Sequence, residues 1–205
     1  MTTSTHHAHH DEPRTPRAAT HAEEGLAPAT PTVTPAARRT LAVLRITMGL
    51  VFLWAFVDKL SGLGWSTSAE RAWVRGGSPT SGFLGNAEVG PLAGLFNALA
   101  GSAVVDWLFM LGMLGIGVAL TLGIGLRVTA VAGTLMMAAM WAAEWPPARL
   151  SLSGEPSGSS NPLLDYHLVY ALVLIALALL GAGATWGLGR RWSETAAVQR
   201  SPWLR

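Results

Sequence analysis

The chain has 205 residues; half are hydrophobic and only 13% carry a charge, against roughly 25% in an average soluble domain. This composition is typical of an integral membrane protein with room for one helical domain. The formal net charge is +2, and the arginines flank apolar segments, which indicates membrane orientation rather than nucleic-acid binding. The absence of cysteine excludes disulfides, thiolate catalysis, iron–sulfur clusters and covalently attached haem c in this chain.

The N-terminal region differs from the rest in composition. Residues 1–39 are rich in Thr, Ala, Pro and His and contain too little apolar material for a core, which predicts a disordered cytoplasmic tail. Within it lies a histidine cluster that could bind a metal ion: His6, His7, His9 and His10. Because no further ligands are fixed near these histidines, a flexible polar tail is favoured. We therefore assign no metal site. The region has no apolar core of its own and does not resemble a cleaved signal peptide.

Four apolar stretches follow, each close to the roughly 17 to 25 residues that a transmembrane helix needs. They cover residues 40–60, 104–125, 127–145 and 164–185. We expect an all-α, integral membrane four-helix bundle over residues 40–189, followed by a basic tail at 190–205. Nine arginines lie in the two tails and in the turn between the second and third stretches, against three in the other two loops. This bias predicts a cell-membrane protein with both termini in the cytoplasm.

The two remaining loops then lie outside the cytoplasm. In the first, about 61–103, an i, i+3, i+4, i+7 apolar pattern with Pro91 in its first turn predicts an amphipathic helix on the membrane surface: Leu92, Leu95, Phe96 and Leu99. A fifth span is the alternative. The second loop, about 146–163, is rich in Pro, Ser and Gly, which predicts irregular structure.

Ionisable residues occur at one particular end of each apolar stretch. In an up-and-down arrangement they all reach the same, outward face: Asp58, Lys59, Asp106, Glu144, Asp165, Tyr166 and His167. Ionisable groups in membrane spans are expensive and by default mark a functional site. We therefore expect one polar site near the outer face.

Lys59 is the only lysine in the chain. With Asp58, Arg71 and Arg75 it could form an anion-attracting pocket that binds a substrate; an interfacial salt bridge is the alternative. Arg45 lies fourteen residues earlier, about 21 Å along a helix, so it cannot serve the same site. We expect Arg45 to extend to the inner headgroups rather than to pair inside the bundle.

His167 and Tyr170 are three residues apart and share a helix face. Asp165 and His167 are two apart, so a direct couple within a regular helix is not expected. A single histidine near the membrane does not suit a b-type haem. Because histidine exchanges protons near neutral pH, His167, Tyr170 and Asp165 are the candidate catalytic residues for quinone chemistry. Simple anchoring at the membrane interface is the alternative.

Four segments of the chain match the pattern of a known family: Asn161–Ala171, Gly181–Gly189, Leu44–Lys59 and Gly125–Arg127. They resemble the DoxX-like membrane proteins, most closely the DoxD type, the quinone-linked thiosulfate dehydrogenase subunit. The resemblance implies a four-helix membrane bundle that passes electrons from thiosulfate to quinone and forms tetrathionate. No flavin or haem motif is present, so a bound quinone or a second oxidoreductase subunit would carry the electrons.

Two other functions stay open. The chain could be a non-catalytic membrane module that anchors or assembles redox enzymes, or a small anion transporter. The transporter is the weakest because the spans have few polar groups at mid-depth. The expected partners are the lipid bilayer, a second subunit and further copies of the chain, with no nucleic acid.

Overall fold

The computed structural model describes residues 1–3 and 33–204, and the chain from Val33 onward forms one compact unit. Every regular element in this described part is a helix; the only β contact there is an isolated bridge between Leu150 and Pro156. The all-α prediction is therefore confirmed. Residues 4–32, with the histidine cluster and most of the expected tail, lie outside the described residues.

Four apolar helices are the longest elements of this unit: α1 (Pro35–Ser61), α4 (Ala103–Leu122), α5 (Leu126–Glu144) and α6 (Tyr166–Leu179). Three of them, α1, α4 and α5, are long and apolar enough to cross a membrane. Many large apolar side chains on the four helices are exposed, among them Leu50, Leu108, Leu111, Val131, Leu135 and Leu172. Apolar surface of this extent indicates contact with lipid or with another protein.

The helix boundaries differ from the predicted ones most in α1 and α6, and α4 ends three residues early at Leu122. α1 begins five residues early because the Thr34 side chain accepts a hydrogen bond from the Ala37 amide and Pro35 occupies the first turn. α6 has only 14 residues, a rise of about 21 Å. It starts late because Asp165 is its N-cap, and it ends early, before Gly181, which has a φ of 61°. A single 3-10 turn, η3 (Ala182–Ala184), follows Gly181.

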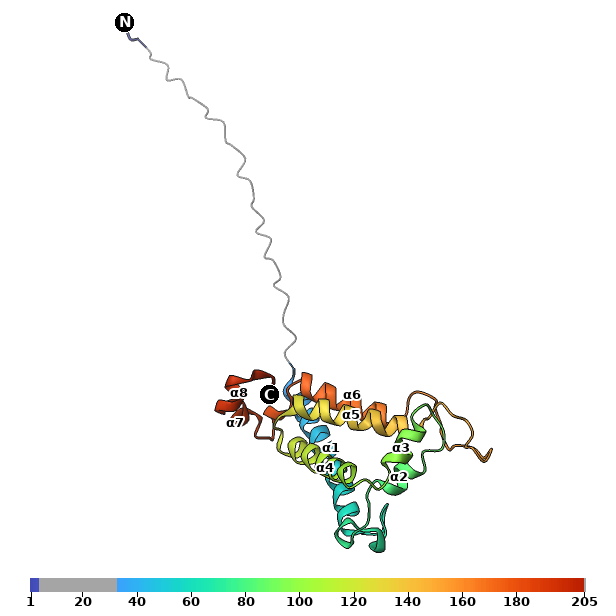
Figure 1. Cartoon of the computed structure of the whole chain (residues 1–205). Coiled ribbons are helices and arrows are strands. Elements are labelled where there is room, and N and C mark those ends of the chain that lie inside the picture. Colours follow the sequence, from blue (N-terminus) through green and yellow to red (C-terminus); the bar gives the residue numbers. More distant parts are fainter. Residues whose placement is uncertain (4–32, 205) are drawn as a thin grey trace. The chain divides into compact units, whose positions relative to one another are not determined.

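The helices pack in two pairs. α1 packs on α4, α5 packs on α6, and contacts between α4 and α5 join the pairs (Figure 1). Their shared core includes Phe52, Met110 and Leu174. α1 approaches α4 closely at Gly117, where an added Cβ would lie 2.7 Å from Cγ of Leu53. The missing side chain therefore sets the spacing of this pair.

The loop between α1 and α4 holds four short helices: η1 (Ala69–Arg71), η2 (Trp73–Arg75), α2 (Ser81–Gly85) and α3 (Ala93–Leu99). α3 falls on the predicted amphipathic segment, although Pro91 precedes it instead of lying in its first turn. Phe96 packs with Leu84, whereas Leu95 is exposed. With seven residues, α3 is too short to be a fifth span.

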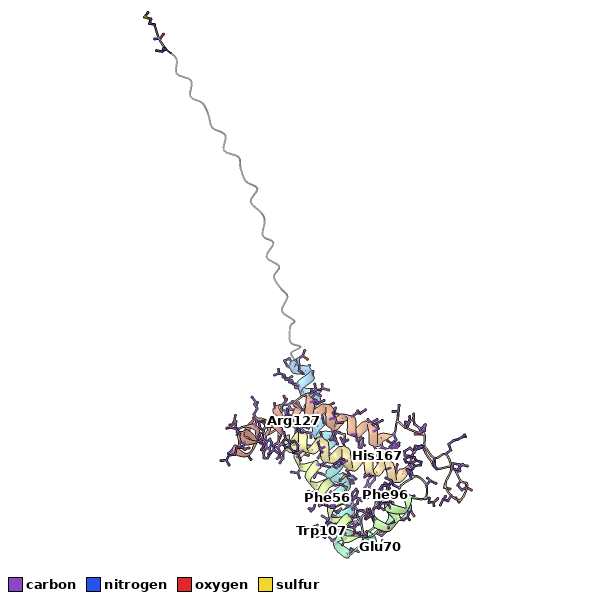
Figure 2. All side chains as sticks on the ribbon, turned by 45° about the horizontal axis from the view of Figure 1, so that its top comes forward. Phe56, Glu70, Phe96, Trp107, Arg127 and His167 are labelled. Carbon is purple, nitrogen blue, oxygen red and sulfur yellow. The ribbon has the colours of Figure 1, made fainter. Side chains whose placement is uncertain are left out.

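The ionisable ends of the apolar helices form two groups: those of α1 and α4 bond the loop between these helices, and those of α5 and α6 bond each other. Glu144 at the end of α5 contacts Tyr166 at the start of α6, and Lys59 at the end of α1 lines a cavity with Val105 of α4. We call the end of the helices that carries both groups the ionisable end. The opposite end carries α7 (Gly189–Ser193), α8 (Ala196–Arg200) and η4 (Pro202–Leu204) (Figure 1). Figure 2 shows His167 and Arg127 at the two ends of the α5–α6 pair.

Candidate functional site

Arg45 is fully buried at the end opposite the ionisable one. Its guanidinium donates to the carbonyl oxygens of Leu120 and Thr121, and to those of Thr185 at 3.3 Å and Trp186 at 3.0 Å. The expectation that Arg45 extends to the headgroups is wrong. The carbonyls at a helix end lack intrahelical partners, and Arg45 supplies donors to the end of α4 and to the segment after α6. Its role is structural.

Two buried carboxylates at the ionisable end hold the loop between α1 and α4. Asp58 accepts hydrogen bonds from the backbone amides of Trp65 and Ser66 and, at 2.6 Å, from the Ser66 hydroxyl. Asp106 accepts from the Ser78 hydroxyl and from the amide and hydroxyl of Thr80. Both carboxylates are thus occupied by the loop.

The four residues expected to bind a substrate anion lie in different surroundings. Asp58 is turned into the loop, and Lys59 lines an apolar cavity without a hydrogen bond or ion pair to any described residue. Arg71 and Arg75 are exposed at the ends of η1 and η2. The expected substrate anion, thiosulfate, is a dianion, and inside an apolar cavity with one cation it would keep one uncompensated negative charge. The exposed Arg71 and Arg75 therefore suit this anion better than Lys59 does.

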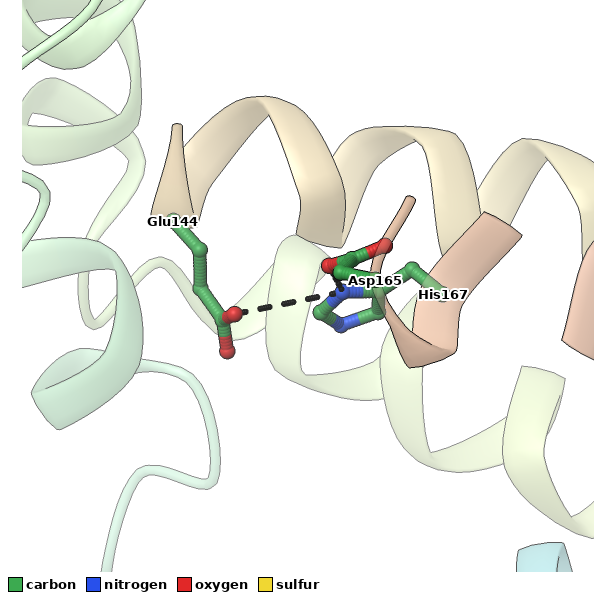
Figure 3. Close-up of side chains that lie close together, drawn as sticks. All are labelled: Glu144, Asp165 and His167. Carbon is green, nitrogen blue, oxygen red and sulfur yellow. Dashed lines mark hydrogen bonds and ion pairs between the residues drawn. The ribbon is translucent and has the colours of Figure 1, made fainter. Parts of the chain in front are cut away.

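His167 forms the centre of a polar cluster between α5 and α6. Its side chain is 0% exposed, and its Nδ1 lies 2.7 Å from Oδ2 of Asp165 (Figure 3). The expectation that these two residues do not couple is wrong. Asp165 precedes the helix with extended backbone (φ −105°, ψ −177°), so its side chain folds back over the first turn. Its other oxygen accepts a hydrogen bond from the Leu168 amide at 3.2 Å.

Glu144 and Tyr166 complete this cluster, although neither was among the predicted catalytic or substrate-binding residues. Oε2 of Glu144 lies 3.9 Å from Nδ1 of His167, and the Tyr166 hydroxyl donates to Oε1 of Glu144 at 2.9 Å. Both residues are ionisable and lie at the ends of apolar stretches of the sequence, and this position could have identified them as site residues. Tyr170 is half-buried beside Tyr166, with ring centroids 5.9 Å apart, and does not line the histidine cavity.

An apolar cavity of about 480 Å³ adjoins the histidine and is lined by α5, by α6 and by the two residues Leu163 and Leu164. Two polar atoms on its lining residues are buried and have no partner within the described part of the chain: Nε2 of His167 and Oγ1 of Thr134. Trp141 and Met137 contribute large apolar walls. Apolar walls with a few convergent polar atoms are typical of a small-molecule site.

A more polar cavity of about 730 Å³ also adjoins the cluster and is lined by Glu144, Asp165, Tyr166 and loop residues that include Glu88 and several serines. The cluster therefore borders both a more polar cavity and an apolar one. Donor atoms of Glu144, Asp165 and His167 lie within 4.8 Å of one another, close enough for a cation. The hydrogen bond to Asp165 already uses Nδ1 of His167, so the geometry is explained without a metal.

No family model matches the chain, and no curated protein and no solved structure shows a significant similarity to it. The resemblance to the DoxX-like proteins therefore stays a prediction.

Proposed function

We propose that this chain is a four-helix membrane protein that binds a quinone in the His167 cavity and passes electrons to it from thiosulfate or a related sulfur compound. The observation that carries the proposal is the buried His167, held by Asp165 on one side, with its other nitrogen free beside an apolar cavity. The sulfur donor comes from the family resemblance alone.

The histidine geometry suits proton-coupled chemistry. When Nδ1 donates to Asp165, neutral His167 presents Nε2 as a proton acceptor, and the imidazolium form presents it as a donor. A quinone headgroup offers carbonyl oxygens to such a donor and a flat apolar ring to Trp141 and Met137. The Thr134 hydroxyl is a second donor for the same ring. The Asp165 carboxylate stabilises the imidazolium between proton transfers.

In the proposed reaction two thiosulfates join through a new S–S bond and release two electrons. The quinone takes up those electrons with two protons and becomes the quinol. One proton comes from Nε2 of protonated His167, and the polar cavity at Glu144 and Asp165 gives water access for its replacement and for the second proton. The exposed Arg71 and Arg75 are the proposed contacts for the thiosulfate anion.

The proposal includes α6 as the fourth membrane crossing and both termini in the cytoplasm. Two features support this arrangement: the arginine bias between the loops, and the antiparallel contact of α6 with α5 at Glu144 and Tyr166. The short α6 is extended at its start by the apolar Leu163 and Leu164, which are both exposed. The ionisable end then faces outward, where thiosulfate is found.

The test is thiosulfate-dependent reduction of a soluble quinone analogue in membranes from a host without thiosulfate oxidation. The chain is expressed as wild type, as His167→Gln and as Thr129→Val, a control on α5 whose hydroxyl bonds Gly125 and does not line the cavity. Loss of the proton-transferring group should lower the rate by about a hundredfold or more, with quinone binding reduced far less. The control should match the wild type.

Equal rates for the wild type and His167→Gln would contradict the assigned role of the histidine. Quinone binding without any thiosulfate-dependent reduction, in membranes that hold abundant folded protein, would point instead to a module that acts with a separate redox subunit.

A further inference from the structure

A third cavity, of about 270 Å³, lies at the ionisable end between α4, α5 and the α2–α3 segment. Its walls are almost wholly apolar and include the aromatic rings of Phe83, Phe96 and Phe109 and the side chains of Met136 and Met140. Lys59 is the one charged residue that lines it. The cavity is separate from the histidine cavity, with which it shares no lining residue.

Lys59 has no counter-charge in contact among the described residues. The adjacent Asp58 attracts Lys59 through its charge, but its oxygens accept three hydrogen bonds from the loop. Asp106, which bonds Thr80 of the cavity lining, accepts three from Ser78 and Thr80. The Thr80 hydroxyl also lines the cavity, but it donates to Asp106 at 2.6 Å. The lysine is therefore the polar group left to meet a ligand here.

We propose that this cavity binds an amphiphilic monoanion of the fatty-acid class, with its carboxylate on Lys59 and its chain along Phe109 and Met140. Charge complementarity selects the anionic head, and the apolar walls select the chain. Thiosulfate has no apolar part, and a neutral quinone leaves the ammonium without a counter-charge. Ala139, which also lines the cavity, is exposed and gives a chain access from the lipid-facing surface. The inference does not depend on the proposed function.

The single lysine makes this site directly measurable. The full chain in phosphatidylcholine nanodiscs is treated with an amine-reactive reagent, alone, with laurate or with dodecanol, and the modification of Lys59 is measured by mass spectrometry. Laurate should protect Lys59 at least about tenfold, whereas dodecanol, which has the same chain and no charge, should protect it little. The N-terminal amine of the same chain is the internal control and should react equally in all three samples. Equal protection by both compounds, or by neither, overturns the proposal.

Direct binding of laurate gives a second measurement. Loss of one charge-assisted hydrogen bond in Lys59→Met should weaken binding by about ten- to a hundredfold, whereas Lys59→Arg keeps the charge and should stay within a few-fold of wild type. Ala139→Phe, which fills the cavity and leaves the lysine, should also weaken binding. If folded Lys59→Met bound laurate with unchanged affinity, Lys59 would not recognise the carboxylate head group, and this result would contradict the proposal.

Discussion

Arg45 and His167 are both completely buried and ionisable, yet they lie at opposite ends of the helices and have opposite surroundings. Both terminal nitrogens of Arg45 bond backbone carbonyls, and the residue lines none of the cavities described above. His167 has one nitrogen fixed by Asp165 and the other free beside a cavity. Burial of an ionisable group therefore does not identify a functional site by itself; a buried polar atom without a partner, on a residue that lines a cavity, is the stronger indication.

Removal of the Arg45 donors should have the largest effect. Arg45→Met leaves the carbonyls of Leu120, Thr121 and Trp186 without their partner, and each buried unpaired carbonyl costs about 1–3 kcal/mol. We expect a large fall in the melting temperature in detergent. The control is Arg38→Met, because Arg38 is exposed on the same helix and bonds only its neighbour Val33. A melting temperature equal to that of the control would show that Arg45 has no structural role.

The close contact of α1 with α4 should give the next largest effect. In Gly117→Ala the added Cβ would lie 2.7 Å from Cγ of Leu53 and 3.0 Å from its backbone nitrogen, so the helices must separate. Overpacking of this kind costs about 1–3 kcal/mol. The matched control is Gly115→Ala on the same helix, where no atom lies within 4 Å of the new Cβ. Chemical or thermal unfolding should separate the two variants; a control as unstable as Gly117→Ala would argue against close packing as the cause.

The smallest effect concerns the histidine end. Thr134→Val removes a buried hydroxyl that has no partner among the residues the structure describes, so the stability of the chain should change little. Quinone affinity should fall about two- to tenfold, the contribution of one neutral hydrogen bond. Thr129→Val should give the reverse, with unchanged affinity and a small loss of stability, because its hydroxyl already bonds Gly125 at 3.0 Å. Equilibrium binding and melting temperatures, measured on both variants, test this crossed pattern.

The sequence was sufficient for the coarse architecture. Apolar segments of spanning length predicted the helices, and the position of charge within them placed Glu144, Asp165 and His167 at one end. The couple between Asp165 and His167 was not predictable, because it depends on a helix boundary exact to one residue: one turn further inside the helix the two side chains diverge. Arg45 was misjudged because its partners are backbone carbonyls, which every residue carries and no sequence pattern reveals.

Asp165 carries out two tasks with one carboxylate: one oxygen caps α6 at Leu168, and the other orients the imidazole of His167. The same atom group thus sets where the helix starts and how the candidate site is aligned. A residue that caps well but has no charge, such as serine, would keep the helix and release the ring, so a single substitution can separate the two tasks. Selection for a correctly folded α6 alone would therefore not preserve the alignment of the histidine, and an aspartate at this position serves both tasks at once.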